Sequence, residues 1–304
     1  MARDLKCPAC GADKWKEFLG DKDLMECSLC ALVFDRGAAW DRDYYEHERV
    51  SAIDEGKLRA RRRNVLQRAR LCERVLRKDS RLLDIGCGEG LFLMELRRRV
   101  AEVIGLEPTL KYVDYAKREL NLNVRQGVIE EADFPAGHFD VITMFHVLEH
   151  LEDPAKALKR ISSWLKPGGH LIIEVPNIKS PTAVYRGLNW ELIIPEHRLY
   201  FAPRSLSCLL ERAGFKTVFV KSRDFDQYRG SMGKSLRKLG LSFKKPLNAG
   251  ERQTKKRGDK ARERKLSLVR RIRKGAQLPL EAMLGWMVLG FNRGDHLFAI
   301  FRKG

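Results

Sequence analysis

The sequence predicts an α/β fold, with a doubly wound, mostly parallel sheet behind a small cysteine-rich unit. The first observation is an alternation of short apolar runs with helical segments from residue 81 onward, which is typical of parallel strands joined by helices. The second is a glycine-rich turn, residues 86–90, between the first apolar run and the helix after it. The third is two Cys-x-x-Cys pairs within the first 36 residues.

Length and composition indicate a globular protein. A chain of 304 residues with 44% hydrophobic residues can bury a large core. Its net charge of +19 is high and calls for an anionic partner. The first ten residues, MARDLKCPAC, lack the apolar stretch of a secretion signal, and no run reaches the ~20 apolar residues that span a bilayer. We therefore expect a cytoplasmic protein, with no transmembrane segment.

Residues 1–36 predict a zinc ribbon. One pair of cysteines is Cys7 and Cys10, and the other is Cys27 and Cys30. Each pair places two thiolates on a tight turn, and two facing turns give four sulfurs in the tetrahedral arrangement that suits Zn²⁺. Four thiolates leave no open position, so we expect a structural rather than a catalytic zinc. A redox pair is the alternative, but it would need only one Cys-x-x-Cys, beside a strand–helix unit.

Residues 37–80 are expected to form a linker and an N-terminal helix. The linker, 37–56, carries three aromatic side chains that could cover a pocket or anchor the linker: Trp40, Tyr44 and Tyr45. A helix is predicted over 57–77, because apolar residues recur there on one stripe. These are Val65, Ala69, Cys72 and Leu76.

The stretch Arg81–Gly90, RLLDIGCGEG, is the centre of the predicted domain. A buried strand ends at a turn in which three glycines allow tight curvature, and a helix starts at Leu91. Backbone N–H groups at such a helix start can bind an anionic group. Asp84 precedes the turn, and Glu107 ends the next strand. An acidic residue at that strand end can accept hydrogen bonds from both ribose hydroxyls.

The spacing of these residues identifies the expected ligand. A dinucleotide fingerprint would place a third glycine at position 91, which is Leu91. Asp84 can instead reach an amino group, and Glu107 a ribose, so the ligand carries an amino acid at one end and a nucleoside at the other. S-adenosylmethionine (SAM) has this structure. The motif resembles the first motif of class I SAM-dependent methyltransferases, which implies their Rossmann-like, seven-stranded fold. A glycine-rich turn in another α/β domain is the alternative.

The rest of the domain, within 81–304, alternates as this fold requires. Strands are predicted at 81–86, 102–107, 123–128, 140–145 and 171–177, and helices at 91–100, 109–120 and 154–165. A turn is predicted at KPGG, residues 166–169, and a helix at 204–213 is followed by a strand. The last strand, 296–304, is similar to the antiparallel seventh strand of the family. Ligands of such sheets bind at the C-terminal ends of the strands.

Later motifs of the same family resemble residues 139–177. The resemblance implies that Gly86, Cys87, Gly88 and Gly90 line the cofactor together with Asp84 and Glu107. It also implies that Phe145 and His146 border the cofactor and that Ile129 and Glu130 lie near the adenine. Val128 stands where family members often carry an acidic residue, so adenine would be contacted through backbone N–H groups.

Three residues are candidates for catalysis: His150, Glu196 and His197. The segment around His197 resembles zinc-ribbon sugar C-methyltransferases, in which a histidine at this position acts as a base. Histidine suits proton removal near neutral pH, and Glu196 could orient or charge it. A purely structural role for either histidine is the alternative.

The basic stretch 223–275 holds 19 Lys and Arg against 5 Asp and Glu, and the apolar segment 278–291 follows it. We expect a basic helical insertion, 223–291, that docks on an anionic surface: membrane headgroups, nucleic acid or a phosphorylated substrate. Charges that are merely solvated, with a buried helix after them, are the alternative.

The predicted function is SAM-dependent methyl transfer to a small-molecule or lipid-linked acceptor, such as a sugar or glycan intermediate. An RNA methyltransferase is one alternative, although few aromatic residues that could stack on bases lie in the basic stretch. A non-catalytic module that binds SAM or another protein is the second. The protein is expected in the cytoplasm, with peripheral membrane contact through residues 223–291.

Overall fold

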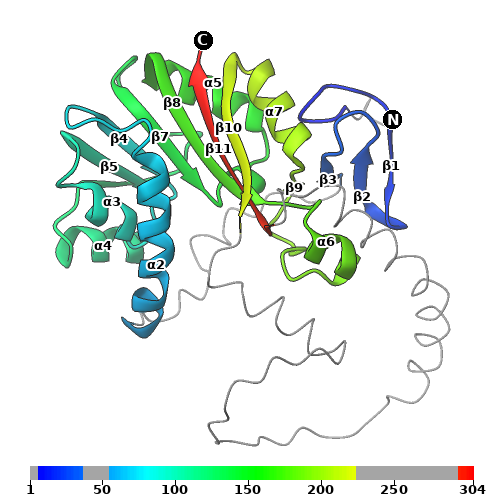
Figure 1. Ribbon diagram of the computed structural model, residues 1–304, viewed down its shortest axis with the longest axis horizontal. Coiled ribbons are helices and arrows are strands. Elements are labelled where there is room, and N and C mark those ends of the chain that lie inside the picture. The colour runs from blue at the N-terminus through cyan, green and yellow to red at the C-terminus, as the bar shows by residue number, and fades with distance from the viewer. Residues whose placement is uncertain (1–5, 37–54, 224–293) are drawn as a thin grey trace, which may run out of the picture.

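The computed structural model describes residues 6–36, 55–223 and 294–304 (Figure 1). The predicted linker, up to residue 54, and the basic insertion from residue 224 onward lie outside the described residues. The predictions for these two stretches therefore stay predictions.

The described chain contains the predicted seven-stranded, mostly parallel sheet. Its strand order is β10-β11-β8-β7-β4-β5-β6. The five strands from β8 to β6 are parallel, and β11 runs antiparallel to both of its neighbours. The strands span Arg81–Ile85 (β4), Glu102–Glu107 (β5), Val124–Gln126 (β6), Phe139–Phe145 (β7), Leu165–Pro176 (β8), Phe215–Arg223 (β10) and His296–Lys303 (β11). The order reverses direction at β4, which is where ligands of doubly wound sheets bind.

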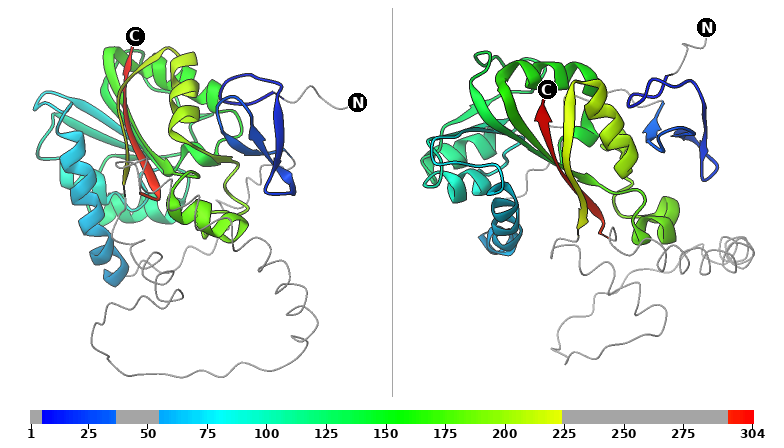
Figure 2. Two further views of the ribbon diagram at one scale, coloured as in Figure 1. Left: turned by 45° about the vertical axis from the view of Figure 1, so that its right-hand side comes forward. Right: turned by 45° about the horizontal axis from the view of Figure 1, so that its top comes forward.

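Helices cover both faces of the sheet (Figure 2). They span Glu55–Cys72 (α2), Leu91–Leu96 (α3), Leu110–Arg118 (α4), Pro154–Trp164 (α5), Pro181–Arg186 (α6) and Pro203–Arg212 (α7). Helices α2, α3 and α4 pack with one set of sheet residues, and α5 and α7 with the other. Neighbouring residues of β4 show this division, because Leu82 belongs to the first core and Leu83 to the second.

Several predicted boundaries were wrong, among them the end of the helix predicted over 91–100, which stops at Leu96. The helix predicted over 57–77 ends at Cys72, because the N–H groups of Val75 and Leu76 turn back to the Cys72 carbonyl. The predicted turn at residues 166–169 is part of β8, which accommodates Gly168 at φ 73°. By contrast, α5 begins as predicted, with Pro154 in its first turn and the Asp153 side chain accepting a hydrogen bond from the N–H of Lys156.

A second sheet contains the cysteines and one strand from the main domain. Its order is β1-β2-β3-β9, with strands Trp15–Phe18, Asp21–Cys27, Val33–Asp35 and Leu199–Tyr200. Figure 1 shows β1, β2 and β3 in blue beside β9 and α7. We refer to residues 6–36 as the four-cysteine unit and to residues 190–202 as the His197 segment. Within the described residues, no helix combines the length and apolar character needed to cross a bilayer.

Candidate functional site

The glycine-rich turn follows β4 and is held to the next strand. The N–H of Gly86 donates to the carbonyl of Leu106 at 2.7 Å. Gly86 has φ 70°, and a Cβ there would lie 2.4 Å from Val147 Cγ2. Only glycine fits this left-handed and crowded position.

Gly88 lies at the tip of the same turn and faces open space. Its φ is 53°, and nothing lies within 4 Å of the position that a Cβ would take. Its N–H donates to Glu107 Oε2 at 2.9 Å. Gly90 ends the turn at the start of α3. Cys87 is buried, and this burial raises the pKa of its thiol. The turn thus exposes backbone rather than side chains to a ligand.

Asp84 is a buried carboxyl group at the end of β4. It is 3% exposed and accepts a hydrogen bond from Thr143 Oγ1 at 2.6 Å. Burial raises its pKa to about 7, against the opposing effects of Thr143 and Arg68. A cationic group bound beside Asp84 would restore its ordinary ionisation.

Glu107 ends β5, one strand away from Asp84. Its carboxylate accepts hydrogen bonds from the N–H groups of Gly88 and Thr109, at 2.9 and 3.0 Å. Burial raises the pKa of Glu107, and these two hydrogen bonds oppose the rise. Each carboxylate oxygen keeps a lone pair that can accept from a hydroxyl group.

The other residues predicted at the cofactor differ in exposure. Ile129 is buried, whereas Glu130 next to it is exposed. Phe145 is 9% exposed and contacts the Phe92 ring edge-on, with centroids 5.0 Å apart. Among them, only Glu130 has a side chain well exposed to solvent.

One polar residue that the sequence analysis missed lies on α2. Asn64 is 2% exposed, and neither atom of its amide has a hydrogen-bond partner among the described residues. On the same helix, Arg61 bonds Glu89 of the glycine-rich turn at 2.7 Å, and Arg68 bonds Glu174 of β8. Asn64 lies between these two positions. A buried amide without partners costs stability and suits a polar ligand.

His146 follows β7 and lies between two buried carboxylates. Its Nδ1 is 3.1 Å from Glu149 Oε1, and its Nε2 is 2.9 Å from Glu174 Oε1. Burial alone would lower the pKa of His146, but the two carboxylates outweigh it and raise the pKa to about 9. His146 has φ 58°, a left-handed conformation that is uncommon outside glycine. The histidine is therefore fixed as a cation within the protein.

Arg68 completes this group from the opposite side. Its guanidinium donates two hydrogen bonds to Glu174, at 3.0 and 2.5 Å. Burial opposes the ionisation of Glu174, but Arg68 and His146 hold its pKa well below the usual range. We name Arg68, His146, Glu149 and Glu174 the β7–β8 charge cluster.

His150 and His197 meet beside Glu149. One ligand atom of each of these three residues lies within 4.8 Å of the other two, so that they could hold a metal ion. The rings of the two histidines have centroids 4.8 Å apart. We name Glu149, His150 and His197 the His197 cluster.

Backbone carbonyls fix both histidine rings. His197 Nδ1 donates to the carbonyl of Leu192 at 2.8 Å, and His150 Nδ1 donates to that of Glu196 at 2.9 Å. In the neutral ring of His197, Nε2 is therefore the proton acceptor. Burial lowers the pKa of His197, so this ring is neutral at pH 7.

Glu149, rather than Glu196, is the carboxylate in this cluster. Glu149 is fully buried, and His146 lowers its pKa to about 2 although burial opposes this shift. Glu196 contributes its backbone carbonyl, as the acceptor for His150. The carboxylate that the structure places beside His197 is therefore that of Glu149, and a role of the Glu196 side chain in orienting His197 stays a prediction.

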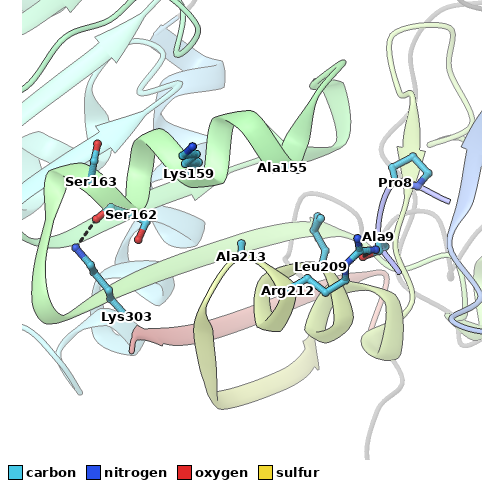
Figure 3. A pocket seen from close by; sticks show the side chains of 10 residues that line it. All are labelled: Pro8, Ala9, Ala155, Lys159, Ser162, Ser163, Leu209, Arg212, Ala213 and Lys303. Atoms are coloured by element: carbon cyan, nitrogen blue, oxygen red, sulfur yellow. Dashed lines mark hydrogen bonds between the residues drawn. The ribbon is translucent and has the colours of Figure 1, made fainter. Parts of the chain in front are cut away.

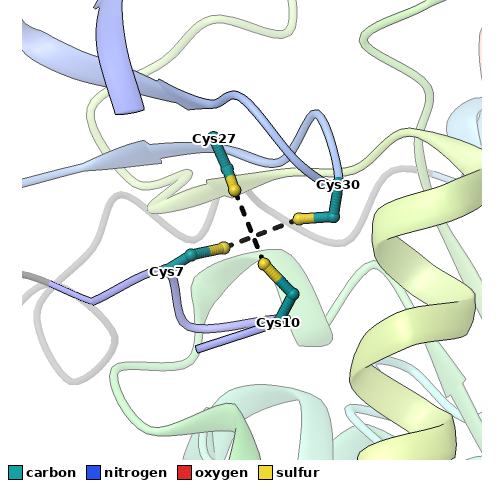
Figure 4. A group of neighbouring side chains, drawn as sticks. All are labelled: Cys7, Cys10, Cys27 and Cys30. Atoms are coloured by element: carbon teal, nitrogen blue, oxygen red, sulfur yellow. Dashed lines mark hydrogen bonds between the residues drawn. The ribbon is translucent and has the colours of Figure 1, made fainter. Parts of the chain in front are cut away.

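The four cysteines converge at one point, as Figure 4 shows. Their sulfurs lie within 4.8 Å of one another, with Cys7 and Cys30 at 3.6 Å and Cys10 and Cys27 at 3.5 Å. A disulfide would need about 2.05 Å, whereas four thiolates around Zn²⁺ at about 2.3 Å stand roughly 3.8 Å apart. The hydrogen bond with Cys30 lowers the pKa of Cys7 to about 5. The cysteine geometry fits a zinc ion.

A groove of about 510 Å³ lies between the four-cysteine unit, α5 and α7 (Figure 3). Its lining includes Ser162, at the end of α5, and Lys303, at the end of β11. Because β11 runs antiparallel to β8, this end of the sheet is opposite to Asp84, Glu107 and His146. The groove is therefore separate from the cofactor edge.

The strand order, the glycine-rich turn and the two acidic strand ends together define a SAM-dependent methyltransferase. The sequence model of the methyltransferase domain family matches residues 57–220, which is more than half of the chain. The chain belongs to this family.

Curated relatives are similar to about half of the chain. A ubiquinone biosynthesis O-methyltransferase of Marinobacter nauticus is 31% identical over 159 residues, which cover 47% of this chain and 67% of the relative. The enzyme of the same name from Coxiella burnetii is 34% identical over 160 residues, covering 49% and 68%.

Solved structures show the same fold at low identity. A SAM-dependent methyltransferase from Archaeoglobus fulgidus superposes with a TM-score of 0.52 at 22% identity, covering 82% of this chain and all of that one. Phosphoethanolamine N-methyltransferase 2 of Haemonchus contortus, in complex with SAM, gives a TM-score of 0.51 at 15% identity, covering 89% and 61%.

Proposed function

We propose that SAM binds across the ends of β4 and β5, where Asp84 receives its amino group and Glu107 its ribose hydroxyls. The buried Asp84 carboxyl has one hydrogen-bond donor in Thr143, and the space beside Gly88 is open to a ligand. The unpartnered amide of Asn64 adds a further polar contact from α2. Bound there, SAM supplies the methyl group and the sulfonium that leaves as a thioether.

The acceptor is proposed to be a small molecule that is methylated on oxygen. The observation that carries this proposal is the His197 cluster, in which His197 lies beside the turn that follows β7 and could receive a proton from a hydroxyl group. The similarity to enzymes named as O-methyltransferases favours oxygen over carbon as the methylated atom. A lipid-linked or sugar acceptor is a narrower form of the same proposal.

His197 is the proposed general base. Its Nδ1–H is held by the Leu192 carbonyl, so that Nε2 can take the acceptor's proton as the oxygen attacks the methyl carbon. The nearby Glu149 carboxylate favours the resulting imidazolium. His150 is oriented in the same way, by a hydrogen bond to a backbone carbonyl, and helps to place the hydroxyl group of the acceptor.

Labelled SAM incubated with separate small-molecule, lipid and RNA fractions of a cell extract tests the acceptor class. Label in the small-molecule or lipid fraction is expected. Label in RNA alone would contradict the proposal and favour an RNA methyltransferase. No label in any fraction, together with tight SAM binding, would favour a non-catalytic SAM-binding protein.

We also propose that the four-cysteine unit holds one structural Zn²⁺ through Cys7, Cys10, Cys27 and Cys30. Residues 1–36, which contain this unit, would form a zinc ribbon, followed by the linker and helix 37–80 and by the methyltransferase domain 81–304. A segment of this size has too small a core to fold alone, so metal binding would supply its folding free energy.

A further inference from the structure

The four-cysteine unit shares its sheet with the His197 segment. Strand β9 pairs antiparallel with β3, in the register Val33 to Tyr200 and Phe34 to Leu199. The N–H of Asp35 also donates to the carbonyl of Arg198 at 3.0 Å. The partner strand is thus only two or three residues from His197.

A separate apolar core joins the same two parts of the chain. It contains residues of the four-cysteine unit packed with residues that follow β8. Its members are Phe18, Leu24, Val33, Ile178, Ala183, Trp190, Tyr200 and Ala202. Val33 is fully buried and Tyr200 is 2% exposed. Through this core the four-cysteine unit and the His197 segment bury each other. The unit also contributes Met25, Leu32 and Phe34 to the main-sheet core that contains α5 and α7.

The other side of the His197 segment is tied to the methyltransferase domain. The N–H of Arg198 donates to the carbonyl of Glu149 at 2.9 Å, and the N–H of Ile178 donates to the carbonyl of Phe201 at 2.9 Å. Within the segment itself, the Tyr200 hydroxyl donates to the carbonyl of Ile194 at 3.2 Å. The segment is therefore clamped between β3 and the turn that follows β7.

We propose that the four-cysteine unit positions His197: by adding β9 to its own sheet, it holds the proposed base against Glu149. The inference rests on the proposed roles of His197 and of zinc. It gives the unit a place in the acceptor site, without any contact of its own with the reacting atoms.

The cysteines lie close in sequence to the strand that pairs with β9, so metal binding is linked to the β3–β9 pairing. The N–H of Cys27 donates to the carbonyl of Leu32 at 2.8 Å, and β3 begins at the next residue, Val33. Fixing the thiols of Cys27 and Cys30 therefore fixes the start of β3. Without metal this turn loses its anchor, and β3 loses the geometry that β9 requires.

The cofactor edge does not depend on these contacts. Asp84 bonds Thr143, and Glu107 bonds Gly88 and Thr109, so that these hydrogen bonds stay within the main domain. Loss of the β3–β9 pairing should thus change the position of His197 and leave SAM binding intact.

Hydrogen exchange on the full chain, with and without a thiol-specific zinc-displacing reagent, tests the link. Metal content is measured on the same samples. After metal loss, we expect amides of residues 196–202 to exchange at least about tenfold faster, with β4 unchanged. SAM affinity, measured by calorimetry, should stay within about twofold. Unchanged exchange at 196–202 after complete metal loss would overturn the proposal. Equal acceleration throughout the domain would also overturn it, because the unit would then support the whole fold.

Two variants at one position test the pairing with all four cysteines intact. Asp35→Pro removes the N–H that bonds Arg198, whereas Asp35→Ala keeps it. With metal content equal, Asp35→Pro should show faster exchange at 196–202 and at least about tenfold lower turnover than Asp35→Ala, because both variants lose the side chain and only Asp35→Pro loses the N–H. Equal behaviour of the two variants would refute the link.

The Asp35 comparison stands even if the purified protein contains no metal, since it needs only the β3–β9 pairing. Absence of metal would contradict the zinc proposal alone. If exchange rises in Asp35→Pro but His197→Gln retains full turnover, the proposed base is wrong and the strand link stands.

Discussion

Arg68 of α2 donates two hydrogen bonds to Glu174 of β8, at 3.0 and 2.5 Å. Glu174 is fully buried, and the side chain of Arg68 is 15% exposed. Through these two residues, helix α2 is joined to strand β8 within the β7–β8 charge cluster.

Arg68→Met should lower the free energy of unfolding by on the order of 3 kcal/mol, because it leaves the buried Glu174 with His146 as its remaining partner. Urea denaturation at pH 7 measures the loss. Arg70→Met, at an exposed position on the same helix, is the control and should change stability by less than about 0.5 kcal/mol. Equal losses in the two variants would show that the Arg68–Glu174 pair contributes no more to stability than an exposed arginine does.

Stability should depend on pH through His146. Its pKa is raised to about 9, so its contribution is complete below pH 6.5 and is lost as the pH rises through 9. Glu149, with its pKa lowered to about 2, contributes above pH 4.5 and loses that contribution as the pH falls. The pair therefore stabilises most between pH 4.5 and 6.5.

His146→Asn is the variant for this test, since asparagine tolerates the left-handed φ of 58°. Urea denaturation at pH 6, 7.5 and 9 should show the wild-type protein losing stability with rising pH. The variant should be less stable at pH 6 and should change less between pH 6 and 9. Parallel curves for the two proteins would contradict the role assigned to His146.

Glu107→Gln should weaken SAM binding by about tenfold to a hundredfold, because hydrogen bonds to a charged group contribute roughly 1.5–3 kcal/mol. Calorimetric titration measures the affinity. Glu102→Gln, at the partly exposed start of the same strand, controls for the change of charge. An unaltered affinity in Glu107→Gln would remove the ribose assignment.

His197→Gln should lower turnover by about 10²–10⁴-fold with SAM affinity intact, as expected for the loss of a general base. Because burial lowers the pKa of His197, the acidic limb of the wild-type pH–rate profile should lie below pH 6.5. His150→Gln is the comparison and should retain that limb. A limb that persists in His197→Gln would assign the base elsewhere.

Metal analysis should find one zinc per chain, and Cys27→Ser should lose it. Cys208→Ser is the matched control, because Cys208 is partly buried and lies outside the four-cysteine cluster. Plasma mass spectrometry on protein purified without chelators measures the content. Zinc retained at full occupancy in Cys27→Ser would contradict the assignment.

Local patterns predicted the main sheet well. The strand at 102–107 was predicted with its observed bounds, because an apolar run bounded by charges specifies a buried strand. The convergence of four cysteines also followed from spacing alone. These features depend on residues close in sequence or on a strong chemical preference.

Long-range pairings were beyond local patterns. Strand β9 has two residues, and it is a strand only because β3, more than 160 residues earlier, pairs with it. The β7–β8 charge cluster brings together Arg68 from α2, His146 from the end of β7 and Glu174 from β8. The sequence did contain one signal: Glu174 is the charged residue in the apolar run 171–176 of β8, and a buried charge requires a partner.

The place of β11 in the sheet bears on how the chain is assembled during synthesis. β11 lies between β8 and β10, although β10 is translated first, and Ser222 and Gly294, 72 residues apart, are hydrogen-bonded at 2.6 Å. On the ribosome, β10 has no strand to pair with until β11 emerges, and the apolar edge of β8 stays open for the same interval. Nascent chains that stall between these two strands should therefore be the species that chaperones hold and that aggregates most readily.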